Sequence, residues 1–194
     1  MARNFIHGMF AHYVATGYNL EHDKNENLWF TYFQNQEKFY PLKSDHWYWQ
    51  HIKYRDPNIK PIVDYIEKDV KWFCFQHSIP KDAIDYEKSK LTLHRFDREN
   101  YMAKFKDPHS FINVFYSLRC LNNLHTRLVV HNENPVHYPL DGEFGVLTNK
   151  NEFVMAPGTC IVHLNTQPQE IVKNPLHIST YMIMVRYYEK EKNK

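Results

Sequence analysis

The sequence predicts an α+β fold in which helices from the first half of the chain pack on an antiparallel jelly-roll core. Residues 124–188 form short β-rich segments with turn signals roughly every 8 to 12 residues, a spacing typical of sandwiches and barrels. The chain has 194 residues, of which 43% are hydrophobic and 16% aromatic, so one domain can bury a core. We therefore expect a single domain over 1–194, with a helical and strand cover at 1–110, the jelly-roll core at 111–188 and a charged tail at 189–194.

The first core segment, residues 124–133, alternates along its length. Successive side chains of an extended strand point to opposite faces, so one face of this segment collects most of its charged and imidazole groups. That face carries His125, Arg127, Val129, His131 and Glu133. We expect this polar face to line the mouth of the jelly roll, where barrels commonly bind ligands.

Two further core segments continue the pattern. Residues 157–165 begin with a Pro-Gly turn and continue as an apolar-rich strand that carries His163. Residues 177–188 are β-branched and aromatic for most of their length. Shorter strand candidates at 137–140 and 143–147 lie between the first two core segments.

Two helices are expected before the core. Residues 58–77 form the clearer one, because apolar residues recur at helical spacing on one face. These residues are Ile62, Ile66, Val70 and Phe73. The other helix is expected at 44–56, where Ser44 can cap its start and Pro57 would end it.

Three further segments favour strands. The aromatic run at 28–33 predicts a strand at a sheet edge or cover, and residues 90–96 alternate as a strand. Residues 111–121 are compatible with a strand or with a short helix capped by Asp107, and we favour the strand.

Composition and charge exclude several classes. The net charge of +2 leaves no concentrated basic stripe, so the sequence gives no strong signal for nucleic-acid binding. No apolar run approaches the roughly 18 residues of a membrane span. Cys74, Cys120 and Cys160 are odd in number and far apart, which argues against a disulfide framework and predicts a reducing, cytoplasmic compartment. Cys160, in an apolar strand, is expected to be buried and inert.

Histidines and one glutamate suggest a metal site. His131-x-Glu133, followed by His177 and then Arg186, imitates the ligand order of non-haem iron sites, in which two imidazoles and a carboxylate occupy one face of the metal. The odd separation of His177 and Arg186 would send them to opposite faces of an unbroken strand, so both could reach one pocket only across a bulge. His125 is a further candidate ligand.

A second arrangement recruits some of the same residues. A cupin-type site would use four ligands on adjacent strands, and a Pro-Gly turn would precede the last of them. The candidate ligands are His131, Glu133, His137 and His163. The other interpretation of each histidine is an ordinary hydrogen-bonded strand residue.

Four short motifs carry a resemblance to a known family. They are His137-Tyr138-Pro139-Leu140, Pro157-Gly158, Leu164-Asn165-Thr166, and Asn174 followed by the strand from His177 to Arg186. In these motifs the segment from about 111 to 188 resembles the double-stranded β-helix of Fe(II)/2-oxoglutarate oxygenases. It is most similar to the aspartyl/asparaginyl β-hydroxylase-like branch, including versions encoded by phages. The resemblance implies a jelly-roll core and, in an active enzyme, Fe(II) and 2-oxoglutarate as cofactors.

The same resemblance implies that the catalytic site is degenerate. The family's distal metal histidine falls at Gln169, and its arginine that clamps 2-oxoglutarate falls at about His177. His125 or His131 could stand in for the proximal metal histidine. A shift of one residue would instead place Glu170 at the distal position.

Two functions follow from these expectations. The first, which we favour, is a non-catalytic binding or assembly protein without a cofactor, such as a component of a phage particle, with protein partners or a homo-oligomeric state, in the cytoplasm or the virion. The second is an Fe(II)/2-oxoglutarate-dependent hydroxylase with an atypical ligand set. Its candidate metal ligands are His125, His131, Glu133 and His177, and its candidate cofactor contacts are Arg186 and His137.

Overall fold

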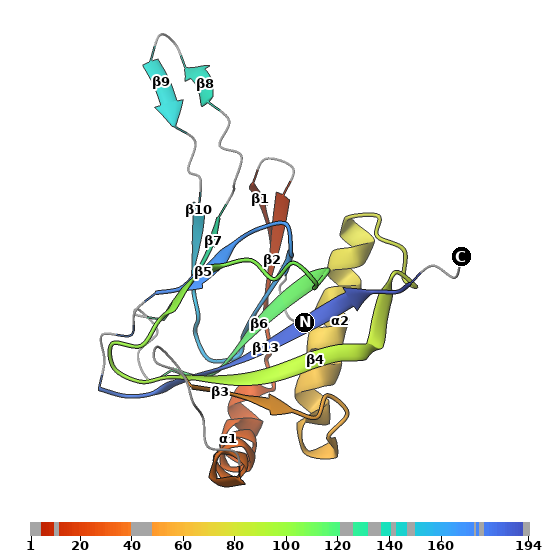
Figure 1. Ribbon diagram of the computed structural model, residues 1–194, viewed down its shortest axis with the longest axis vertical. Helices are drawn as coiled ribbons and strands as arrows, with labels where there is room; N and C mark the ends of the chain where they lie inside the picture. The colour runs from red at the N-terminus through yellow and green to blue at the C-terminus, as the bar shows by residue number, and fades with distance from the viewer. Residues whose placement is uncertain are drawn as a thin grey trace.

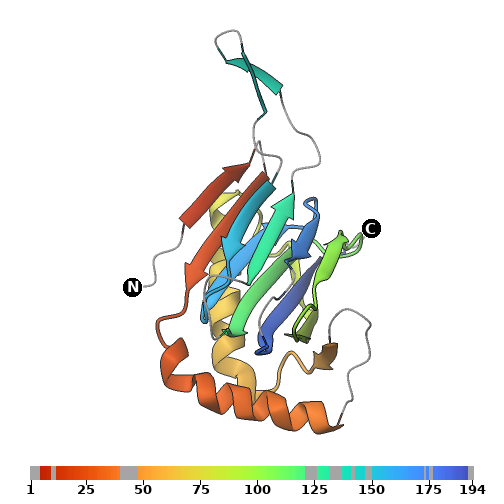
Figure 2. The ribbon, with the colours of Figure 1, turned by 90° about the vertical axis from the view of Figure 1, so that its left-hand side faces the viewer.

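Two β-sheets face each other, and two helices cover the outer face of the larger sheet (Figures 1 and 2). This computed structural model describes residues 5–9, 12–39, 48–120, 126–131, 137–140, 143–146, 150–172, 174 and 177–191. The pairs of neighbouring strands are antiparallel throughout. The predicted α+β fold with an antiparallel jelly-roll core is confirmed.

The larger sheet has seven strands. In spatial order they are β1 (Phe5–Met9), β2 (His12–Tyr18), β11 (Thr159–Leu164), β6 (Ile112–Arg119), β13 (Thr180–Glu189), β4 (Ile84–Phe96) and β3 (Tyr48–Ile52). The smaller sheet has four strands, in the order β10 (Lys150–Val154), β7 (Arg127–His131), β12 (Gln169–Ile171) and β5 (Met102–Phe105). The hairpin of β8 (His137–Leu140) and β9 (Glu143–Val146) stands away from both sheets (Figures 1 and 2).

Strands from both halves of the chain build these sheets. β4 and β5 come from the segment that was expected to be a cover, yet β4 pairs with β13 and β5 pairs with β12. The barrel therefore begins before residue 111. The strands expected at 90–96 and 111–121 are confirmed as parts of β4 and β6.

The helix predicted at 58–77 is confirmed. Asp56 caps a 3-10 turn (Pro57–Ile59) by accepting a hydrogen bond from the Asn58 backbone N–H, and α2 (Lys60–Gln76) follows directly. The predicted apolar face of α2 is buried against the larger sheet, where it meets Val114, Val162 and Ile183. A surface helix gains most of its stability from burying such a face.

Two other predicted elements are wrong. Residues 28–33 lie inside helix α1 (His22–Phe39), where Trp29 and Phe33, four positions apart, are both buried on one helical face. Within the segment expected to be a helix at 44–56, residues 48–52 form the edge strand β3. Burial alternates there with a period of two residues, because Gln50 and Ile52 are buried whereas Trp49 and His51 are exposed.

The two faces of the larger sheet belong to two separate cores. One core lies between this sheet and the helices, and the other lies between the two sheets. The second core consists of Val14, Phe96, Met102, Phe115, Leu128, Val130, Phe153, Met155, Ile161, Ile171, Met182 and Met184. Among the described residues, no helix has the length and hydrophobicity that crossing a membrane requires.

Gly17 on β2 allows close approach of helix α2. A Cβ atom at this position would meet the Asp69 carboxylate and would lie 2.9 Å from the Tyr65 hydroxyl. The Asp69 carboxylate also interacts with the Cys160 thiol, and together with burial it raises the pKa of that thiol. Cys160 is fully buried, as predicted.

We expect Gly17→Ala to lower the free energy of unfolding by about 1 to 3 kcal/mol, because the added methyl group must displace the buried Asp69 carboxylate and the Tyr65 hydroxyl. Urea unfolding of the variant checks this. Lys68→Ala, an exposed change on the outer side of α2, should alter stability by no more than about 0.5 kcal/mol. Equal stability of Gly17→Ala and the parent protein would contradict the close contact.

Candidate functional site

A row of polar side chains lies on the inner face of the larger sheet. The register places His163 of β11 beside Asn113 of β6, and Asn113 beside Arg186 of β13. Directly paired residues on neighbouring strands point to the same side of a sheet. Gln169 reaches this row from the smaller sheet, and its Oε1 accepts a hydrogen bond of 3.3 Å from Asn113 Nδ2.

The polar row is held by a short chain of hydrogen bonds. Ser110 Oγ donates to Asn113 Oδ1 at 2.9 Å. His163 Nδ1 lies 2.9 Å from the Leu164 carbonyl, which can only accept, so Nδ1 carries the proton and Nε2 presents a lone pair. The Gln169 side chain lies near enough to raise the pKa of His163. Within the described part of the chain, neither His163 Nε2 nor Gln169 Nε2 makes a well-formed hydrogen bond.

Two imidazoles between the sheets are held neutral. Burial lowers the pKa of His163 to about 4, against the opposing effects of the Leu164 carbonyl and Gln169. Burial lowers the pKa of His94 on β4 to about 3, and the nearby Arg186 and His51 act in the same direction. A neutral imidazole is the form that ligates a metal, but it must converge with other donors to do so.

Arg186 carries the positive charge of this region and already has a partner. Its Nε lies 3.1 Å from Asp107 Oδ2, and both side chains are largely shielded from solvent. Asp107 lies in the connection between β5 and β6, close to the end of β5. The charge of the Arg186 guanidinium is therefore neutralised by the Asp107 carboxylate.

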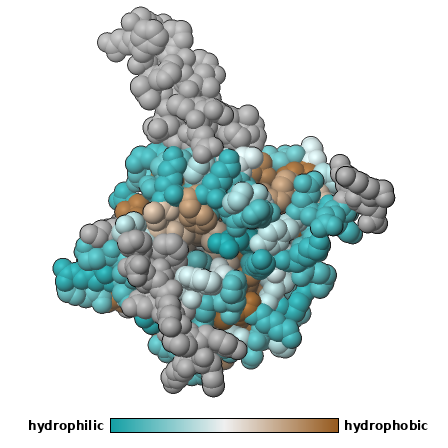
Figure 3. Space-filling view, in the orientation of Figure 1, coloured by the Kyte–Doolittle hydropathy of each residue, from teal (hydrophilic) through white to brown (hydrophobic). Residues whose placement is uncertain are grey.

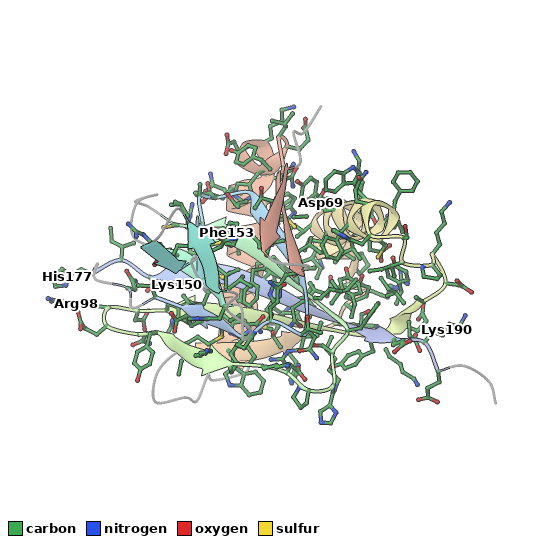
Figure 4. All side chains as sticks on the ribbon, turned by 90° about the horizontal axis from the view of Figure 1, so that it is seen from above. Asp69, Arg98, Lys150, Phe153, His177 and Lys190 are labelled. Carbon is green, nitrogen blue, oxygen red and sulfur yellow. The ribbon has the colours of Figure 1, made fainter. Side chains whose placement is uncertain are left out.

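The predicted site residues lie in separate places. His131 points to the outer face of the smaller sheet, where its Nε2 lies 3.3 Å from Glu170 Oε1. His177 is exposed, 3.0 Å from the Arg98 guanidinium, and Figure 4 shows the two at the opposite end of the molecule from Lys190.

Of the other predicted ligands, His125 and Glu133 lie outside the described residues. For His137 the structure describes the backbone in β8 but no side chain.

The predicted orientation of the first core segment is wrong. On β7, Leu128 and Val130 point into the core between the sheets, so Arg127 and His131 point outward. The interaction of His131 with Glu170 therefore forms outside the barrel, and His163 lies inside it. These two histidines cannot belong to one cupin-type site.

Sequence reasoning named His163, Gln169 and Arg186 of the inner polar row, but it missed Asn113 and the residues around the row. Asn113 offered a signal, because a single amide in an otherwise apolar strand must find a buried partner. Ser110 and His94 offered none that distinguishes them from ordinary polar residues, and Asp107 was considered only as a helix cap.

Comparisons with known proteins identify the fold. No protein-family model and no curated protein matches the chain. A prolyl-4-hydroxylase from Pseudomonas putida matches with a TM-score of 0.65 at 10% identity, over 93% of this chain and 95% of that one. A prolyl hydroxylase from Trichoplax adhaerens matches with a TM-score of 0.64 at 11% identity, over 91% of this chain and 83% of that one. The carbocyclase SnoK, which depends on alpha-ketoglutarate, matches with a TM-score of 0.65 at 5% identity, over 90% of this chain and 79% of that one.

These similarities show that the chain has the double-stranded β-helix fold of Fe(II)/2-oxoglutarate oxygenases. At such low identities the similarity concerns the fold alone. The expected relation to the aspartyl/asparaginyl β-hydroxylase-like branch and to phage proteins stays a prediction.

The residues around Gln169 do not fit an Fe(II) site. Its partners in the smaller sheet are Phe105 on β5 and Val130 on β7, which offer no ligand atoms. From the larger sheet it meets the Asn113 amide and one imidazole, that of His163. Non-haem iron is commonly held by two imidazoles and a carboxylate, and neutral amides are poor substitutes. In the described ranges, no three histidine, cysteine or acidic side chains come together in a group that could hold a metal ion.

The two buried imidazoles make stability depend on pH. In the unfolded chain a histidine binds a proton below a pH of about 6.5. In the folded protein His163 and His94 bind one only near pH 4 and 3. Between about pH 6.5 and these lower pKa values, the unfolded state binds more protons than the folded state. The free energy of unfolding therefore falls as the pH falls below about 6.5. We expect a loss of about 2 kcal/mol per buried histidine between pH 7.5 and pH 5.

Urea unfolding at the two pH values measures this loss. His163→Phe keeps the ring that stacks on Phe115 and should remove about half of the pH dependence that the two histidines cause. His109→Gln, a change at an exposed position, is the matched control and should leave the pH dependence unchanged. Identical pH dependence in His163→Phe and the parent would show that His163 is not held neutral.

Proposed function

We propose that this chain is a non-catalytic binding or assembly protein on an oxygenase-like double-stranded β-helix. The observation that carries the proposal is the environment of Gln169, whose neighbours are an aromatic ring, an aliphatic side chain, another amide and the imidazole of His163. A metal bound there would have to displace the hydrogen bond between Gln169 and Asn113, and from those neighbours it would gain one imidazole, that of His163, and no carboxylate.

The filling of the barrel supports the same proposal. The core between the sheets is built from methionine, aromatic and aliphatic side chains, each no more than 8% exposed. A dicarboxylate such as 2-oxoglutarate would need charged partners in this space, because burying an unpaired carboxylate is costly. Arg186 lies beside Asn113 on the inner face of the larger sheet, and Asp107 already neutralises it.

The alternative function is an Fe(II)/2-oxoglutarate-dependent hydroxylase with an atypical ligand set. The similarity of the fold to prolyl hydroxylases favours it. Its ligands would have to include His125, Glu133 or His137, because His131 and His177 lie apart. β8, which carries His137, stands away from both sheets (Figure 1), so this strand would have to move to bring a ligand to Gln169.

The assembly function is supported by large apolar side chains at the surface. Leu28, Trp49 and Phe75 are 68%, 40% and 74% exposed. On the face seen in Figure 3, the hydrophobic patches are small and separated by hydrophilic surface. Such a surface favours contacts that each depend on one anchoring side chain, rather than a single extensive apolar interface. A phage particle is one setting for such contacts, and it stays a prediction.

Metal and cosubstrate binding test the non-catalytic assignment. We expect no change in melting temperature when the protein is mixed anaerobically with Fe(II), or with Co(II) as a substitute, and 2-oxoglutarate. A functional site should raise stability by about 2.7 kcal/mol at ligand concentrations 100-fold above its dissociation constant. Saturable stabilisation of the parent protein would contradict the proposal and favour the hydroxylase.

A gain-of-function variant provides the control for this titration. Phe105 and Gln169 are directly paired, so Phe105→His with Gln169→His places two imidazoles side by side, near Asp107. We expect Co(II) to stabilise this double variant and to give it a visible absorption band. If the variant binds Co(II) and the parent does not, the substituted side chains account for the difference. If both bind equally, the metal lies elsewhere.

Self-association tests the assembly assignment. We expect the mass measured by sedimentation to exceed that of one chain at high protein concentration. Trp49→Ser should weaken this association at least about tenfold, because a partly exposed tryptophan is a common interface anchor. Thr31→Ala, an exposed change on α1, should not weaken it. A protein that remains monomeric and retains no partner in a pull-down would contradict an assembly function.

A further inference from the structure

We propose that a cavity between the end of α2 and the start of β4 binds a small amphipathic carboxylate. The cavity has a volume of about 290 Å³ and is lined by Lys71, Cys74, Lys81, Ile84 and Tyr86. Cys74 and Ile84 belong to the core on the helix side of the larger sheet, so this cavity is separated by the sheet from the polar row around Gln169. Its occupant does not depend on whether that row binds a metal.

The floor of the cavity is apolar. Cys74 and Ile84 are 4% and 5% exposed, and the half-buried Tyr86 ring packs edge-on against Tyr187 at 5.6 Å. Burial raises the pKa of the Cys74 thiol to about 11, so at neutral pH this side chain is an uncharged apolar wall. The volume lies at the lower end of the roughly 300 to 1,000 Å³ of ligand pockets, which admits a short aliphatic chain or one aromatic ring.

The rim of the cavity is cationic. Lys71 Nζ lies 5.5 Å from the centre of the Tyr86 ring and 3.2 Å from Glu67 Oε2. Its ammonium group has three donors, so the contact with Glu67 leaves donors for another acceptor. Lys81 makes no ion pair with any described residue.

These two properties define the class of ligand. An apolar body would bury against Cys74 and Ile84, and a carboxylate would lie between the two ammonium groups, where charge-assisted hydrogen bonds are strong. Phe75 follows Lys71 by four positions on α2 and therefore lies on the same side of the helix, with 74% of its surface exposed. It can cover the part of a ligand that extends beyond the mouth.

Calorimetric titration of the full chain with octanoate tests the site, with octan-1-ol and octylamine as probes of equal chain length. We expect saturable binding of one octanoate per chain, with a dissociation constant below about 1 mM. Octanol should bind at least tenfold more weakly, and octylamine should not bind measurably. Equal affinity for octanoate and octanol, or no saturation by octanoate, would overturn the proposal.

Lysine variants show whether binding uses this cavity. Lys71→Gln with Lys81→Gln should weaken octanoate binding at least tenfold, whereas Lys68→Gln, an exposed change on the same helix, should leave it unchanged. Both changed side chains are exposed, so the double variant should still fold. If Lys68→Gln weakened octanoate binding equally, the effect would come from net charge alone. That result would overturn the assignment of octanoate to this cavity.

Alkylation of Cys74 gives a second readout that does not depend on the lysines. Octanoate should slow the reaction of Cys74 with a maleimide several-fold, measured by mass spectrometry of peptides, and should leave Cys120 and Cys160 unaffected. Both of those thiols are buried elsewhere in the fold and serve as internal controls. Unchanged reactivity of Cys74 at saturating octanoate would place the ligand outside this cavity.

Discussion

The hydrogen bond between Asn113 and Gln169 is the contact on which the interior of this barrel depends. It joins the two sheets, because Asn113 belongs to β6 of the larger sheet and Gln169 to β12 of the smaller one. A buried amide without a partner costs about 1 to 3 kcal/mol, so each of these side chains holds the other in place. Ser110 extends the network by donating to Asn113 Oδ1. His163 lies beside it with Nδ1 bonded to the Leu164 carbonyl, and the apolar core fills the surrounding space. Packed side chains thus surround this contact, in a fold that the solved structures of two prolyl hydroxylases share.

The layering of the molecule explains why this interior is so closely filled. The larger sheet lies between the helices and the smaller sheet, so its central strands are buried on both faces. On β6 seven consecutive residues are buried, and on β13 the first six are buried. Polar side chains on such strands must be satisfied within the protein. The exposed Trp49 lies on the edge strand β3, and the cavity beside Cys74 lies on the helix side of the larger sheet.

Much of the fold could be predicted from the sequence, but little of the site could. The period of α2 and the β-branched, aromatic character of β13 were clear locally. The aromatic run containing Trp29 and Phe33 fits a strand as well as a helix, and only packing against the sheet decides between them. On β7 the alternation defines two faces, but which face points inward depends on the opposing sheet, so Leu128 and Val130 took the positions expected for His131 and its neighbours. The resemblance, carried by four short motifs, aligned Gln169 with a metal histidine. The structure places Gln169 between the two sheets, and its role as a metal position stays a prediction.

The most direct test of this account is the anomalous X-ray scattering at the iron absorption edge from crystals grown anaerobically with Fe(II) and 2-oxoglutarate. The account predicts no iron peak between the two sheets and an intact hydrogen bond between Gln169 and Asn113. An iron peak within bonding distance of Gln169 or His163, with that hydrogen bond broken, would contradict it.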